Sequence, residues 1–165
     1  MTPAIRRLLV PVDFSAGSNK AVDYAVVLAT ALRAAVHLLH VIEETFATEA
    51  PGEFSAARGP SPRERAIGEA QARVAAIAAG FSGTGGRVTT EVRSGRAARE
   101  IVGVALNRGA DLVVMGTHGR TGLYQVMYGS VAQYVVRNAP CPVLAVCEPG
   151  VDYTPASAGG SAARA

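Results

Sequence analysis

The chain has 165 residues, which is long enough for one compact domain with a hydrophobic core. Its net charge is only +3, and its basic segments, such as residues 58–65, carry no interleaved aromatic residues, which argues against a nucleic-acid-binding surface. No apolar run approaches the ~20 residues of a membrane-spanning helix and no secretory signal is visible, so we expect a cytoplasmic protein without a membrane partner.

Helical and extended patterns alternate along the chain, which is typical of a parallel sheet with helices on both faces. Residues 6–12 predict a first strand, and the apolar spacing over residues 15–34 predicts a helix. Residues 36–42 predict the second strand. Residues 43–60 contain two prolines and two glycines, and we expect a flexible excursion there.

The next helix has a clear start signal. Ser61 and Glu64 form a capping box, Pro62 fits the first helical position, and Gly80 ends the helix. Residues 87–93 then predict the third strand.

Later elements follow the same alternation. We expect Ser94 to cap a third helix that Gly109 closes, followed by a strand at residues 111–116 and a helix at residues 130–138.

The last strand is expected at residues 143–147. Two prolines precede it, which places it at an edge of the sheet. Residues 149–165 have little to bury and are expected to be disordered, so the domain is predicted to span residues 1–148. Cys141 and Cys147 lie too far apart along this strand to form a disulfide, and buried, reduced thiols are the simplest expectation.

A glycine pattern joins the fourth strand to the last helix. Two residues separate Gly116 from Gly119, and nine residues separate Gly119 from the pair Gly129 and Ser130. Glycines at the carboxyl end of a strand and at a helix start let backbone N–H groups approach an anion closely. Residues 112–147 contain no acidic side chain. The pattern therefore predicts a phosphate-binding site.

A carboxylate follows the first strand. In an open parallel sheet, ligands bind beyond the carboxyl ends of the strands, at the point where the winding direction reverses. If the first strand is central and the fourth is its neighbour, Asp13 lies across that point from Gly116. A carboxylate suits sugar or base hydrogen bonds and glycine amides suit phosphates, so the two together predict a nucleotide site.

These motifs resemble those of the universal stress protein family. Residues 114–123, VMGTHGRTGL, closely resemble that family, as do residues 129–132 and 139–144. The opening residues 9–15, LVPVDFS, resemble it as well, and the resemblance covers roughly residues 6–147. The spacing G-x2-G-x9-G-[ST] is the mark of the family's ATP-binding branch.

The resemblance implies a single-domain, Rossmann-like α/β fold: an open parallel sheet of five strands in the order 3-2-1-4-5, with helices on both faces. It implies an ATP-binding regulator of the stress response rather than a metabolic enzyme. It also implies a homodimer, often formed by antiparallel pairing of the two last strands, which here begin at Val143 and end at Cys147. The protein partners stay unknown.

The resemblance also assigns site residues. Asp13 matches the carboxylate near the adenosine, and Val41 matches the residue that faces the base. The positions around the ribose and phosphates are Gly116, Gly119, Gly129 and Ser130. The further expected lining residues are Pro11, Val12, Ser15, Met115, His118, Arg120 and Val131.

Other interpretations of these residues are open. Asp13 could cap the first helix, and Ser130 could cap the last one while it also meets a phosphate. Met115 could belong to the core rather than contact the base. His118 and Arg120 could lie in solvent without touching a phosphate.

Two other functions are also open. A nucleotide-free dimer could act as a scaffold, and a slow ATPase or adenylate-forming enzyme could use a related fold. The chain has no G-x4-G-K-[ST] loop, so we expect slow or no hydrolysis, with Mg2+ held chiefly by the nucleotide's phosphates. His37 and His40 have opposite parity on their strand and face opposite sides, so we expect no metal site. No carboxylate lies close in sequence to His118 to orient it as a base, and we expect no catalytic residue.

Overall fold

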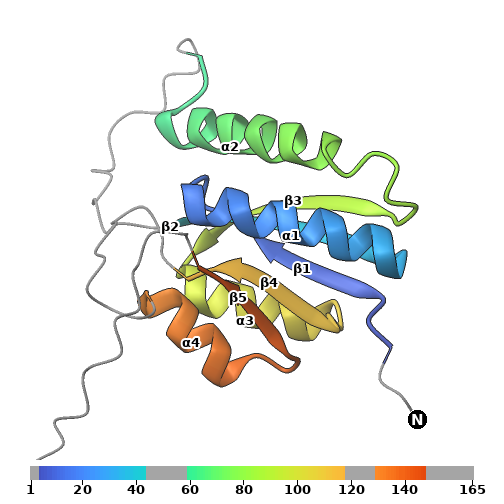
Figure 1. Cartoon of the computed structure of the whole chain (residues 1–165). Coiled ribbons are helices and arrows are strands. Elements are labelled where there is room, and N and C mark those ends of the chain that lie inside the picture. The colour runs from blue at the N-terminus through green and yellow to red at the C-terminus, as the bar shows by residue number, and fades with distance from the viewer. Residues whose placement is uncertain (1–3, 44–58, 118–128, 148–165) are drawn as a thin grey trace, which may run out of the picture.

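The computed structural model describes residues 4–43, 59–117 and 129–147, and Figure 1 shows how they fold. Five parallel strands form one sheet in the order β3-β2-β1-β4-β5. The elements in chain order are β1 (Arg7–Pro11), α1 (Ala16–Leu32), β2 (Ala35–Glu43), α2 (Pro62–Ala79), β3 (Val88–Gly95), α3 (Ala97–Asn107), β4 (Leu112–Gly116), α4 (Ser130–Asn138) and β5 (Val143–Val146).

Helices α1 and α2 cover one face of the sheet, and α3 and α4 cover the other (Figure 1). The expected α/β fold and its strand order are therefore confirmed, including the edge position of β5. The expected excursion lies mostly in residues 44–58, outside the described residues, as does the expected tail. The predicted domain limits stay a prediction.

Successive side chains of a strand point to opposite faces of the sheet, so a hydrophobic core forms on each face. On β1, Leu8 and Val10 pack against α1, whereas Leu9 packs on the α3 side, and each is at most 1% exposed. Fully burying one such side chain contributes about 1.5–3 kcal/mol. Helix α1 meets the sheet through small residues such as Ala25 and Ala29, which are fully buried, so its backbone lies close to the strands.

Of the two predicted helix caps at Ser61 and Ser94, the first is present and the second is not. Ser61 Oγ accepts a hydrogen bond from the Glu64 N–H, and the Glu64 carboxylate accepts one from the Ser61 N–H, as the capping box predicts. The predicted cap at Ser94 is wrong, because β3 stays paired with β2 as far as Gly95. Helix α3 begins two residues later than predicted, after Arg96, and no side chain of the described residues caps it.

Both cysteines are free. Cys141 is partly buried, and this burial raises the pKa of its thiol. Cys147 is exposed because it lies just beyond the end of β5, so the expectation that both thiols are buried is wrong for Cys147. In the described ranges, no helix combines the length and apolar character needed to cross a bilayer.

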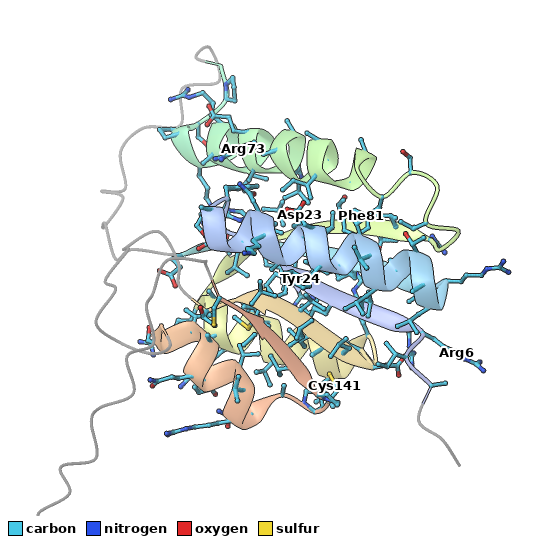
Figure 2. All side chains as sticks on the ribbon, in the orientation of Figure 1. Arg6, Asp23, Tyr24, Arg73, Phe81 and Cys141 are labelled. Atoms are coloured by element: carbon cyan, nitrogen blue, oxygen red, sulfur yellow. The ribbon has the colours of Figure 1, made fainter. Side chains whose placement is uncertain are left out.

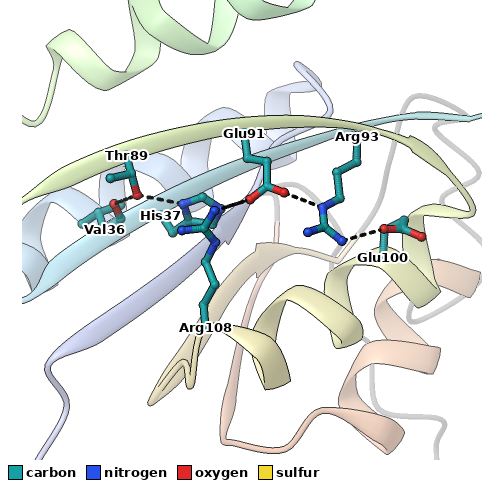
Figure 3. Close-up of polar contacts among 7 residues, drawn as sticks. All are labelled: Val36, His37, Thr89, Glu91, Arg93, Glu100 and Arg108. Atoms are coloured by element: carbon teal, nitrogen blue, oxygen red, sulfur yellow. Dashed lines mark hydrogen bonds and ion pairs between the residues drawn. The ribbon is translucent and has the colours of Figure 1, made fainter.

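A polar cluster joins the edge strand β3 to α3 (Figure 3). The Glu91 carboxylate on β3 accepts hydrogen bonds from Arg93 and, at 2.6 Å, from Arg108 just after α3. It also lies 2.9 Å from Nε2 of His37. The Arg93 guanidinium donates in turn to Glu100 on α3, at 3.1 Å. Helix α3 is thus attached to β3 near both of its ends.

The two titratable groups at the centre of this cluster have shifted pKa values. Partial burial raises the pKa of Glu91, but the hydrogen bonds from Arg93 and Arg108 outweigh that effect and bring the pKa to about 2. Burial lowers the pKa of His37, and the charge of Arg108 lowers it further. The cluster therefore holds an ionised Glu91 beside a neutral His37 at pH 7. His40 lies on the opposite face of the sheet from His37, as the alternation along β2 predicts.

Candidate functional site

A cavity of about 700 Å³ lies beyond the carboxyl ends of β1, β2 and β4. In the sheet, β1 sits between β2 and β4, so the cavity is at the point where the strand order reverses. Ligands of open α/β sheets bind at this point. The wall of the cavity comes from the β1–α1 turn, one face of α2 from Ala66 to Arg73, and the starts of α3 and α4.

The β1–α1 turn holds Asp13 at the cavity. Its Oδ1 accepts hydrogen bonds from the Ser15 N–H at 3.0 Å and from the Ser15 hydroxyl at 2.6 Å. Ser15 Oγ accepts in turn from the Ser18 N–H and caps α1. The alternative that Asp13 caps this helix is therefore wrong. Ser15 is not one of the described residues that line the cavity. Its hydrogen bonds orient the Asp13 carboxylate instead.

Gly116 ends β4 against the start of α1. A side-chain carbon added at Gly116 would lie 2.8 Å from the carbonyl carbon of Gly17 and 3.0 Å from the backbone nitrogen of Ser18. These neighbours are backbone atoms, which cannot rotate away as the end of a flexible side chain could. The absence of a side chain at Gly116 is thus required by packing, in addition to any role toward a ligand.

The start of α4 forms the opposite wall. Gly129 is the N-cap residue, and its N–H donates to the Thr117 carbonyl oxygen at 2.8 Å. Ser130 is the first residue of the helix, so the alternative that Ser130 caps α4 is wrong. In the described part of the chain, no side chain caps α4. Ser130 and Val131 line the cavity where the helix dipole favours a negative charge.

Most of the predicted site residues lie together around this cavity. Met115 lines it while also packing in the core on the α3 side with 5% exposure, so its two interpretations do not exclude each other. His118, Gly119 and Arg120 lie outside the described residues. The predicted residues that line the cavity are Pro11, Val12, Asp13, Val41, Met115, Gly116, Gly129, Ser130 and Val131.

The contribution of α2 to the cavity was not predicted from the sequence. Ala66, Glu69, Ala70 and Arg73 line the cavity, and their spacing places them on one face of that helix. This spacing was a detectable signal, but a single sequence does not tell a helix face over a cavity from one over the core. Phe14, next to Asp13, was also missed and carries a contact with Arg73.

The strand order and the cavity at its reversal point define a doubly wound α/β protein with a ligand-binding crevice. The sequence model of the universal stress protein family matches residues 4–146. The chain therefore belongs to the universal stress protein family.

Several relatives show how widely the similarity extends. Universal stress protein MJ0531 of Methanocaldococcus jannaschii is 35% identical over 144 residues, which cover 87% of this chain and 83% of the relative. The solved structure of MJ0577 from the same organism is 27% identical, with a TM-score of 0.75 over 89% of this chain and 99% of its own. A universal stress protein from Archaeoglobus fulgidus, solved in complex with dAMP, shares the fold at 19% identity, with a TM-score of 0.60 over 88% of this chain and 99% of its own.

Proposed function

We propose that this protein is an ATP-binding regulator of the stress response that acts as a homodimer and hydrolyses ATP slowly or not at all. The observation that carries the proposal is the shared cavity, which has Asp13 on one side and the start of α4 on the other. A nucleotide needs both kinds of group at once. Membership in the family supports the stress-response role, and the dAMP complex of a relative supports an adenine nucleotide as the ligand.

The two ends of the nucleotide meet different chemistry in this proposal. The nucleoside contacts Asp13 and the apolar side chains of Val41 and Met115, all of which line the cavity. The phosphates contact backbone N–H groups at the start of α4, where Ser130 adds a hydroxyl. The neighbouring loop residues His118, Gly119 and Arg120 complete the phosphate end by the family resemblance. Mg2+ stays on the phosphates and water.

Thermal melting with ligand tests this function. Millimolar ATP with Mg2+ is expected to raise the Tm of the wild-type protein, because a ligand that binds only the folded state stabilises it. Asp13→Asn keeps an acceptor for Ser15 but removes the charge, and we expect it to weaken ATP binding about tenfold, as for the loss of a charge-assisted hydrogen bond. Asp23→Asn is the control, because Asp23 is an exposed carboxylate of α1 away from the cavity. A wild-type Tm that ATP leaves unchanged would contradict the proposal.

The proposed dimer uses β5. This strand lies at an edge of the sheet, and an edge strand has unpaired backbone groups that favour pairing with a second copy. Ala145→Glu places a charge in that strand and is expected to shift the protein from dimer to monomer in sedimentation velocity experiments. Gln133→Glu, an exposed position on α4, is the matched control and should leave the dimer intact. A dimer that survives Ala145→Glu would rule out this interface.

The proposal includes a location in the cytoplasm. Two free thiols suit a reducing environment, which supports a cytoplasmic location.

A further inference from the structure

Three side chains stack on the wall of the cavity beneath α2. The ring centroids of Phe14 and His40 lie 4.4 Å apart, with 33° between the ring planes. The same Phe14 ring also contacts Arg73, whose central guanidinium carbon lies 3.8 Å from the ring centroid. Arg73 comes from the middle of α2 (Figure 2). All three residues line the cavity, so the stack ties three separate chain segments to one wall.

The inner end of the stack is rigid. His40 is 6% exposed, and its Nδ1 lies 2.7 Å from the Val12 carbonyl oxygen, to which it donates a hydrogen bond. Phe14 has a φ of +66°, a left-handed backbone conformation that bulky residues rarely adopt. Packing around the Phe14 ring must hold this conformation in place. The ring therefore offers Arg73 a fixed surface.

The donors of Arg73 are not used within the described residues. A guanidinium has five N–H donors at its edge, and contact through its flat face leaves that edge available. Within residues 4–43, 59–117 and 129–147, Arg73 makes no hydrogen bond or ion pair, and its guanidinium makes a cation–π contact with Phe14. The cavity wall thus carries an oriented cation whose hydrogen-bonding capacity remains for a ligand.

We propose that Arg73 is a further ligand-binding residue that donates hydrogen bonds to the nucleoside end of the bound nucleotide. This inference rests on the function proposed above. Arg73 lies on the Asp13 side of the cavity, because its partner Phe14 directly follows Asp13 in the β1–α1 turn. The phosphate end lies at α4, on the other face of the sheet. Adenine ring nitrogens and ribose oxygens are acceptors that suit a guanidinium edge.

Calorimetric titration of the full chain with adenosine, AMP and ATP tests the assignment. Arg73→Met keeps the length of the side chain and removes its donors. Binding of all three compounds is expected to weaken by the same factor, about tenfold, because the contact lies on the part they share. A loss confined to ATP would overturn the proposal, since Arg73 would then serve the phosphates. Unchanged affinity for all three would overturn it as well.

Controls separate this inference from the proposed function. Arg65→Met removes an arginine from the same helix that does not line the cavity, and it should change no affinity. Arg73→Lys keeps a cation over the ring but loses the fork of donors, so an intermediate loss is expected. If the wild-type protein binds none of the three compounds, the proposed function fails and this inference fails with it. Normal wild-type binding with an unaltered Arg73→Met variant overturns the inference alone.

A double-mutant cycle tests the role of the ring as a support. Phe14→Leu removes the surface that orients Arg73, so part of the tenfold loss is expected in that variant as well. If Arg73 acts only while stacked on Phe14, the double variant binds no more weakly than Arg73→Met, within about twofold. Fully additive losses would overturn the assignment of Phe14 as a positioning residue.

Discussion

Replacing Gly86 by alanine is expected to destabilise the fold by at least about 3 kcal/mol, at the upper end of what overpacking costs. An added side-chain carbon at Gly86 would lie 2.0 Å from the carbonyl oxygen of Ala34 and 2.6 Å from its carbonyl carbon. Ala34 is fully buried between α1 and β2. Both close neighbours are backbone atoms, so relief requires the start of β3 to move away from β2.

Urea unfolding followed by circular dichroism measures this effect. Gly68→Ala is the matched control, because Gly68 lies within α2 and an added carbon there has no neighbour within 4 Å. Alanine in a helix interior is favoured over glycine, so this control should gain about 0.5–1 kcal/mol. The two substitutions add the same methyl group and are expected to shift the urea midpoint in opposite directions. Similar midpoints for both variants would show that the close approach at Gly86 relaxes easily.

The second large effect is expected at Glu91. Glu91→Gln leaves Arg93 and Arg108 without the carboxylate that they share, and we expect a loss of about 2 kcal/mol at pH 7. This figure is below that for a fully buried pair because the Glu91 side chain is 20% exposed. The measurement is again the urea midpoint. Glu69→Gln, an exposed carboxylate on α2, is the control and should change stability little.

Acidification should reveal the same group. The pKa of Glu91 falls from 4.5 to about 2 on folding, so its contribution is complete above pH 4.5 and is lost as the pH falls toward 2. Over this pH range the wild-type protein is expected to lose up to about 3 kcal/mol of its free energy of unfolding. Glu91→Gln should remove most of that pH dependence. The lowered pKa of His37 adds a separate decline that begins near pH 6.5, because the unfolded chain takes up that proton first. Parallel wild-type and variant profiles below pH 4.5 would contradict the assignment.

Local signals explain why much of this fold could be predicted. The capping box at Ser61 needs only neighbouring residues, and it forms as expected. The helix and strand periods follow from one-sided burial, and the family resemblance supplied the strand order. The meeting of Asp13 and Gly116 at one cavity then followed from the general geometry of parallel sheets.

Features that depend on distant partners could not be predicted. Glu91 looked like an ordinary strand residue, because His37 and Arg108 reach it from other elements. Several glycines precede β3, and only the fold shows that Gly86 touches the backbone of Ala34. The start of α3 was misplaced for a similar reason: strand pairing with β2 prevailed over the local capping preference of a serine.

The two borders of the sheet differ in chemistry. Strand β3 carries Glu91 and Arg93, which are occupied in the polar cluster, whereas β5 consists of the uncharged residues Val, Leu, Ala and Val. Charged residues within an outer strand discourage the addition of a further strand. The uncharged border at β5 therefore suits the pairing proposed above better than the charged border at β3 does. In the dimer proposed above, association through β5 would use that border in both copies and end at two copies, so the same asymmetry would also prevent open-ended fibres.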